Sequence, residues 1–83
     1  MSYHVYILYS LELDRYYVGH TGNLADRMRR HLGGGSPSTK TARDWELKWV
    51  EEYSTRSEAV ARESYIKSRK SRVYIEGLIL GKG

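Results

Sequence analysis

The chain has 83 residues, of which 40% are hydrophobic, so its length and composition predict one small domain spanning residues 1–83. It has no cysteine, which excludes disulfides and thiolate metal sites and favours a reducing, cytoplasmic location. No secretion signal or long apolar run is present, so we expect no membrane partner. The net charge of +4 favours nucleic acid as a partner, although such an excess is also common on ordinary protein surfaces.

Two β-strands are predicted at the start of the chain. Residues 3–9 alternate and then run apolar, and residues 15–20 are again rich in residues that favour strands. The few residues between them, 11–14, suit a tight turn. We therefore expect a hairpin whose two strands are antiparallel neighbours in the sheet.

A helix is predicted after these strands. Asn23 can cap its N-terminus, and the glycines at 33–35 end it after Leu32. Leu24 and His31 fall on one helical stripe that should face the core, with Arg27 on its border. This helix therefore brings two polar side chains close to the buried side.

A polar loop is predicted over residues 33–44. Lys40 and Arg43 lie near its end, and loops with such side chains can contact the phosphates of a nucleic-acid backbone. We take both residues as candidate nucleic-acid contacts, and a solvated connector is an equally good interpretation.

A third strand is predicted over residues 45–53. Trp45, Leu47 and Trp49, with Tyr53 as a further candidate, alternate there with polar residues, which is the pattern of a β-strand.

Two further helices complete the predicted fold. Thr55 and Glu58 form a capping box that opens a helix to about Lys70, and Ser71 can cap a last helix over residues 72–80. The element order β-β-α-β-α-α predicts an α+β fold, a small three-stranded antiparallel sheet with flanking helices.

Glu63 is the least expected residue of the longer helix. It shares a stripe with Ala59 and Ile66, where the pattern favours an apolar side chain. A carboxylate facing the core is costly unless it is paired or binds a metal. An ion pair with a nearby Lys or Arg at the edge of the sheet is the commoner outcome. No histidine, including His20, has a recognised spacing for a transition-metal ligand.

Four other side chains are suited to phosphate chemistry. Arg27 can bind a phosphate with two hydrogen bonds, and His31 can move protons near neutral pH. Tyr6 and Tyr17 can approach one another on the hairpin, but a tyrosine acts as a base only where nearby positive charge lowers its pKa. Each residue alone is more often structural. Together with Glu63, they indicate a candidate catalytic site.

The chain resembles the GIY-YIG nuclease domains. Residues 4–6, His-Val-Tyr, stand at the first motif of that family, and residues 17–19, Tyr-Val-Gly, match the second motif with one conservative change. Arg27 and His31 follow on the next helix, and Glu63 matches the glutamate that binds metal in the family. The resemblance covers most of the chain. It is closest to the small stand-alone bacterial members, which are similar to the N-terminal nuclease domain of the excinuclease C subunit.

The resemblance implies a metal-dependent endonuclease that hydrolyses phosphodiester bonds in DNA, directed by substrate structure and acting in DNA repair or processing. Glu63 would hold one divalent cation, Mg²⁺ or alternatively Mn²⁺. Tyr6 or Tyr17 would accept a proton from the attacking water, helped by His31, and Arg27 would neutralise charge on the phosphate.

Two alternatives remain open at this point. The chain could be a nucleic-acid-binding module that keeps the nuclease fold with little or no catalysis. Its apolar segment at residues 73–80 could also form a homodimer.

Overall fold

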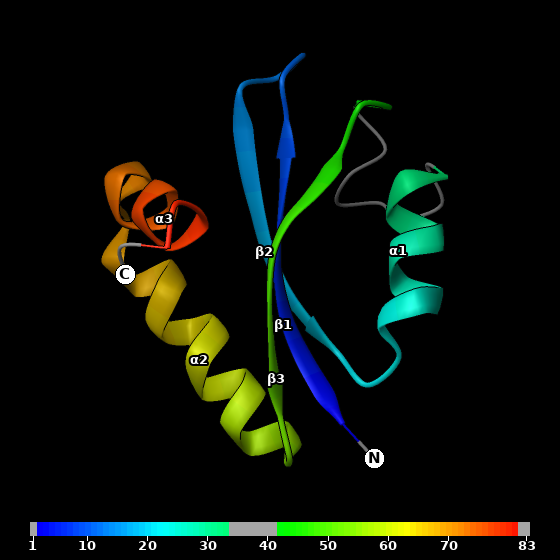
Figure 1. Ribbon diagram of the computed structural model, residues 1–83, viewed down its shortest axis with the longest axis vertical. Coiled ribbons are helices and arrows are strands. Elements are labelled where there is room, and N and C mark those ends of the chain that lie inside the picture. The colour runs from blue at the N-terminus through cyan, green and yellow to red at the C-terminus, as the bar shows by residue number, and fades with distance from the viewer. Residues whose placement is uncertain (1, 34–41, 82–83) are drawn as a thin grey trace.

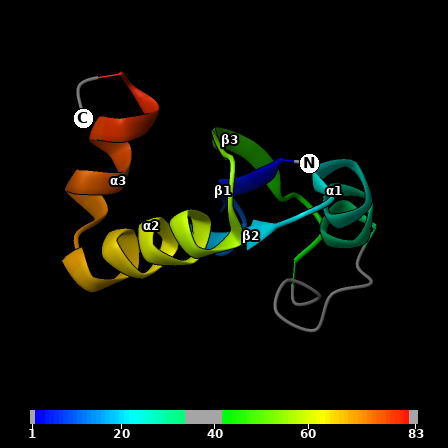
Figure 2. The same cartoon turned by 90° about the horizontal axis from the view of Figure 1, so that it is seen from below.

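The computed structural model describes residues 2–33 and 42–81, and its sheet has the strand order β2-β1-β3. Helix α1 covers one face of the sheet, and α2 and α3 cover the other (Figure 1, Figure 2). The fold is therefore the predicted α+β arrangement. The elements are β1 (Tyr3–Ser10), β2 (Arg15–Thr21), α1 (Leu24–Leu32), β3 (Glu46–Tyr53), α2 (Arg56–Arg69) and α3 (Arg72–Ile79).

The hairpin of β1 and β2 is antiparallel, as predicted, and its register matters for the site. Tyr6 lies opposite Gly19, and Leu8 lies opposite Tyr17. Because β1 also pairs with β3, it is the central strand, and β2 is left as an edge of the sheet. The residues in the middle of β1, from Val5 to Leu8, are all buried.

Strand β3 departs from the predicted alternation. Ile7 pairs with Trp49 and Leu8 with Leu47, so the strand pairing shifts by one residue and Lys48 has no partner on β1. Such an irregularity reverses which face the following side chains point to. The predicted alternation is therefore interrupted in the structure: Leu47 is exposed, and Trp45 packs on the opposite face of the sheet from Trp49.

The predicted helix caps are confirmed. Asn23 accepts a hydrogen bond from the backbone of α1, Thr55 and Glu58 form the complete capping box, and Ser71 caps α3. Lys70 ends α2 in the left-handed conformation, with φ at 48°. This turn lets the chain leave α2 and start α3 without a loop.

The two faces of the sheet carry different cores because successive residues of β1 point in opposite directions. Val5 and Ile7 pack with residues of α2 and α3 in a wholly apolar cluster. Tyr6 and Leu8 pack on the α1 face, where Trp45 closes the cluster. The alternation of β1 thus places one buried tyrosine hydroxyl on the α1 face.

The C-terminal apolar segment packs mostly on its own core. Ile75, Leu78 and Ile79 contact the cluster between the sheet and α2, whereas Val73 and Leu80 are 78% and 71% exposed. Homodimerisation through this segment stays a prediction. None of the helices in the described part of the chain is both long and apolar enough to span a membrane.

Candidate active site

A polar cavity of about 290 Å³, called here the site pocket, lies at the edge of the sheet formed by β2. It contains four of the five predicted catalytic and metal-binding residues. The fifth, His31, is buried beneath the pocket and is hydrogen-bonded to Tyr6. The pocket draws on both faces of the sheet, because it includes side chains from β1, α1 and α2. Its lining residues are Tyr6, Tyr17, Gly19, His20, Thr21, Gly22, Arg27, Arg56 and Glu63.

Gly19 allows the buried Tyr6 to reach this pocket. The two residues are partners across the β1–β2 ladder. A Cβ atom on Gly19 would lie 2.6 Å from the Tyr6 hydroxyl oxygen and 2.8 Å from its ring carbon Cζ, far inside normal contact. The missing side chain on β2 therefore leaves room for the tyrosine ring to cross toward the edge.

Tyr6 and His31 form a buried hydrogen-bonded pair. The Tyr6 hydroxyl oxygen lies 2.8 Å from His31 Nε2, and both residues are 1% exposed. The Tyr17 ring lies near them in a tilted arrangement, 5.1 Å from His31 and 6.3 Å from Tyr6 between ring centroids. Burial lowers the pKa of His31, and the positive charge of Arg27 lowers it further. A neutral imidazole follows, and its Nε2 can accept the Tyr6 proton.

Tyr6 is not a ready base. Burial raises the pKa of its hydroxyl well above the ordinary value, and neighbouring Tyr17 adds to this effect. Arg27 lowers the pKa, as a tyrosine base requires, but its contribution is smaller than that of burial. Tyr6 therefore remains protonated at neutral pH, and it can pass on a proton only through a partner such as His31.

Among residues 2–33 and 42–81, no carboxylate forms an ion pair with the guanidinium of Arg27. Arg29 and Arg30, on the same helix, are exposed and pair with Asp26 at 3.1 and 3.3 Å. Arg27 lies instead in the site pocket, partly buried, where its charge acts on the Tyr6 and His31 side chains. It is therefore available to an anion that enters the pocket.

Glu63 is held by two nitrogen atoms. His20 Nδ1 lies 2.5 Å from one carboxylate oxygen, and Lys67 Nζ donates to the other at 2.7 Å. Burial alone would raise the pKa of Glu63, but the hydrogen bonds from Lys67 and His20 outweigh it, so the pKa falls below its usual value. The ion pair with a lysine at the sheet edge is therefore present, and the ionised carboxylate also lines the site pocket.

The donor set of this pocket fits a Mg²⁺-type cation only in part. In the described residues, no three His, Asp or Glu side chains gather as a ready-made metal cage. Mg²⁺ is usually held by one or two carboxylates, with water and substrate phosphate oxygens completing the shell. The single carboxylate of Glu63 fits that kind of site, in which the substrate supplies the remaining ligands.

Sequence reasoning missed five residues of the pocket. Three of them bear on its chemistry: Gly19, as the opening for Tyr6, His20 and Arg56. His20 could have been found from the alternation of β2, since it follows Val18 by two residues and so faces α2. Arg56 lies seven residues before Glu63, a spacing that returns to the same side of a helix. Its guanidinium lies 5.2 Å from the Tyr3 ring centroid.

The predicted nucleic-acid contacts are not part of the site pocket as described. Arg43 is exposed and is not among the lining residues. Lys40 lies outside the described residues. Both stay predictions.

Comparison with known proteins agrees with this geometry. The family model described as the GIY-YIG catalytic domain matches residues 2–75. The chain belongs to the GIY-YIG family. This GIY-YIG chain is also 34% identical to the UPF0213 protein YazA of Bacillus subtilis over 77 residues, which cover 88% of the chain and 78% of that protein.

A solved structure shares the GIY-YIG fold of the chain. The solution NMR structure of the UPF0213 protein BH0048 from Bacillus halodurans matches with a TM-score of 0.62 and 28% sequence identity. The match covers 100% of this chain and 87% of the other. The GIY-YIG chain thus has the nuclease fold of its family, whose members are typically endonucleases.

Proposed function

We propose that this GIY-YIG chain is a divalent-metal-dependent endonuclease that hydrolyses phosphodiester bonds in DNA. We further propose that it acts as a single domain, is directed by the structure of its substrate, and serves DNA repair or processing. The observation that carries the proposal is the meeting of Tyr6, Arg27 and Glu63 in one polar pocket at the sheet edge. Family membership supports the reaction class.

Arg27 binds the scissile phosphate in this proposal. Its guanidinium lies in the pocket and forms no ion pair with a described carboxylate. It can therefore form an ion pair with a phosphate oxygen of the substrate. A fixed guanidinium stabilises the charge that builds up on the phosphoryl oxygens during attack by water. Groups of this kind contribute about 10²–10³-fold to the rate of other enzymes.

Tyr6 and His31 move the proton of the attacking water. As the water oxygen bonds to phosphorus, its proton passes to the Tyr6 oxygen, and the Tyr6 proton passes to His31 Nε2 at 2.8 Å. The bond from phosphorus to the leaving oxygen breaks, and that oxygen takes a proton from solvent. The relay suits a tyrosine whose pKa is raised by burial, because free tyrosinate is never formed. Tyr17, also in the pocket, is the alternative first acceptor.

Glu63 would hold the cation, which when bound would stabilise negative charge on the phosphate and the leaving oxygen. Lys67 and His20 keep the Glu63 carboxylate ionised in the structure, as the lowered pKa of that group indicates. An ionised carboxylate with two exchangeable partners is suited to take up a cation together with substrate.

One observation favours the second candidate, a binding module with little or no cleavage. Lys67 already neutralises Glu63, which leaves Arg27 and Arg56 as excess positive charge in the site pocket. A pocket in this state attracts a phosphate without any metal. The two candidates therefore differ in the effect of a divalent cation: it leads to cleavage of the DNA in the first, and it alters only the binding of DNA in the second.

The test is cleavage of labelled single-stranded, duplex, flap and branched DNA, with RNA counterparts, in Mg²⁺, in Mn²⁺ and in chelator. Glu63→Gln is the inactive variant. Glu52→Gln is the matched control, because it makes the same change at an exposed carboxylate on β3. We expect cleavage by the wild type and by Glu52→Gln with metal, and none by Glu63→Gln. Salt-sensitive binding without cleavage would support the binding module instead.

A further inference from the structure

Positive side chains form a row along the side of α2 that carries Glu63. Arg56 and Lys67 lie seven residues before and four after Glu63, spacings that return to the same side of a helix, and Lys70 is the left-handed residue that ends α2. Arg56 lines the site pocket together with Glu63. The proposed catalytic carboxylate thus lies between one cation toward the start of α2 and two toward its end.

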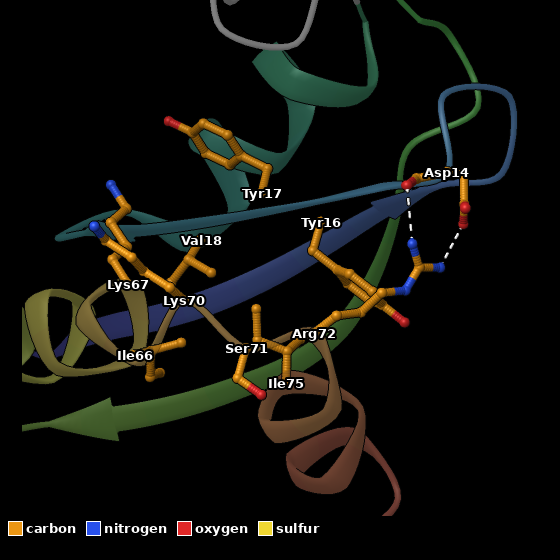
Figure 3. Close-up of a pocket in the computed structure, with 10 residues that line it drawn as sticks. All are labelled: Asp14, Tyr16, Tyr17, Val18, Ile66, Lys67, Lys70, Ser71, Arg72 and Ile75. Atoms are coloured by element: carbon orange, nitrogen blue, oxygen red, sulfur yellow. Dashed lines mark hydrogen bonds and ion pairs between the residues drawn. The ribbon is translucent and has the colours of Figure 1, made fainter.

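A second cavity, called here the flanking pocket, continues from the site pocket toward the end of α2. It has a volume of about 450 Å³, and its lining residues are Asp14, Tyr16, Tyr17, Val18, Ile66, Lys67, Lys70, Ser71, Arg72 and Ile75. The side chains of Lys67 and Lys70 extend toward the same end of it, away from Arg72 (Figure 3). Tyr17 lines both pockets, and Lys67 also donates to Glu63. The two pockets therefore adjoin one another along β2.

The cations of the row and of the flanking pocket differ in how far protein carboxylates neutralise them. Arg72 pairs with Asp14 and Glu76, and Lys67 pairs with Glu63. Lys70 and Arg56 have no ion pair with any described carboxylate. The unneutralised charges therefore lie at the two ends of the row, one in each pocket.

We propose that the site pocket and the flanking pocket form one groove for the sugar–phosphate backbone of the cleaved strand. Arg56 contacts a phosphate on one side of the scissile bond, and Lys70, with Lys67, contacts phosphates on the other side. The placing of the scissile bond at Glu63 rests on the proposed nuclease function. The groove itself rests on the two adjoining pockets and on the unneutralised cations in them.

The dimensions of the helix agree with this path. With a rise of about 1.5 Å per residue, Arg56 and Lys70 lie roughly 10 Å along α2 on either side of Glu63. One strand of a DNA duplex advances about 3.4 Å per nucleotide. For a duplex whose axis runs along α2, the row would thus correspond to roughly three nucleotides on each side of the scissile phosphate.

The experiment measures binding in the cleavage-inactive Glu63→Gln chain, without divalent metal. A labelled duplex is titrated by fluorescence anisotropy over a series of NaCl concentrations. Arg56→Gln and Lys70→Gln are each added, and Lys48→Gln is the matched control, since it removes the same charge at the opposite edge of the sheet. We expect each groove variant to weaken binding about three- to tenfold and to reduce the slope of log K against log[salt] by about one. The control should change both much less.

Folding and conservative variants complete the test. Thermal unfolding checks that each variant is folded, and Lys70→Arg should restore both affinity and slope because it restores the charge. Slopes for Arg56→Gln and Lys70→Gln equal to that of Lys48→Gln would overturn the groove, as would the absence of salt-sensitive binding. If the groove variants differ but the wild type never cleaves, the nuclease proposal fails and the groove stands. If the wild type cleaves but the slopes are equal, the groove proposal fails and the nuclease proposal stands.

Discussion

Two charged clusters flank α2, and they differ in how fully the protein satisfies them. On the side of β3, Arg62 donates to both oxygens of Glu51 at 2.9 and 3.1 Å and to the Tyr74 hydroxyl at 3.2 Å. Glu51 also accepts hydrogen bonds from Trp49 and Tyr53. In this cluster, called here the β3 network, each charged group thus forms an ion pair with a charged group of opposite sign in the protein.

The site pocket on the side of β2 is built differently. Arg27 has no carboxylate partner among the described residues, and Glu63, the residue next to Arg62, faces the pocket. Partly buried charges that meet each other hold a fold together, whereas a charge left in a cavity is available to a ligand. The comparison indicates that the β3 network stabilises the sheet and that the site pocket serves substrate.

The pKa values follow the same division. In the β3 network, burial would raise the pKa of Glu51, but hydrogen bonds from Arg62 and Tyr53 outweigh it and lower the value. Burial, followed by the hydrogen bond to Glu51, raises the pKa of Tyr53 to about 12. Both groups are thus fixed in one charge state across the physiological range. Beneath the site pocket, burial and the charge of Arg27 lower the pKa of His31, so its imidazole is neutral and can accept a proton from Tyr6.

Loss of the Arg27 charge should have the largest effect. We expect Arg27→Gln to lower the cleavage rate about 10²–10³-fold, because a charged contact to the phosphate is removed. The free energy of unfolding should change by less than about 1 kcal/mol, since no ion pair within the described residues is broken. Single-turnover cleavage and urea unfolding measure the two effects. Arg29→Gln, on the same helix but paired with Asp26, is the control and should cleave at the wild-type rate.

Loss of the Arg62 charge should have the opposite profile. Arg62→Met leaves Glu51 partly buried beside two weaker donors, and we expect unfolding to become easier by about 2 kcal/mol. The cleavage rate per folded molecule should stay within about twofold of wild type, because Arg62 lies outside the site pocket. Urea unfolding at 25 °C gives the first quantity. A large loss of rate in a folded Arg62→Met chain would contradict the division between the two clusters.

A Cβ atom at residue 19 should disturb the proton relay with a moderate effect. Gly19→Ala forces the Tyr6 hydroxyl away from its place beside His31, and we expect a loss of about 1–3 kcal/mol in stability and about tenfold in rate. Gly77→Ala is the matched control. A Cβ there meets no atom within 4 Å and lies in a helix, so this variant should gain up to about 1 kcal/mol. Equal thermal shifts in the two variants would show that Gly19 has no special role.

The smallest predicted effect is a pH dependence that arises from His31. Because the pKa of His31 is lowered in the fold, the unfolded chain binds a proton at a higher pH than the folded chain does. Stability should therefore fall as the pH drops through and below the ordinary histidine pKa of about 6.5. Between pH 7.5 and 5.5, we expect the free energy of unfolding of His31→Gln to fall by up to about 1 kcal/mol less than that of the wild type. Unfolding curves at the two pH values test this, and equal losses in both chains would exclude His31 as the source.

The sequence predicted the elements that depend on local patterns. The alternation of β1 predicts the strand that carries Tyr6, and the stripe of α1 predicts that His31 faces the core. Capping residues such as Thr55 and Ser71 are likewise local signals, and they set the starts of α2 and α3 correctly.

The remaining features depend on which strand neighbours which. The slip of β3 beside Ile7 has no signature in the alternating pattern, so the exposure of Leu47 could not be predicted from that pattern. His20 becomes the partner of Glu63 only because β2 is an edge strand that α2 packs beside. The role of Gly19 follows from the cross-strand register. Such contacts between distant segments cannot be read from spacing along the chain.

The most direct measurement compares Glu63→Gln with Glu51→Gln in one set of experiments. Both changes remove a partly buried carboxylate that is paired with a cation, one in the site pocket and one in the β3 network. Urea unfolding and metal-dependent cleavage are measured on the same preparations. We expect Glu63→Gln to lose at least about 100-fold in cleavage, with the free energy of unfolding changed by less than about 1 kcal/mol. We expect Glu51→Gln to lose about 1–3 kcal/mol of stability and to cleave normally per folded molecule. Normal cleavage by Glu63→Gln would contradict the assignment of the site pocket as the catalytic site.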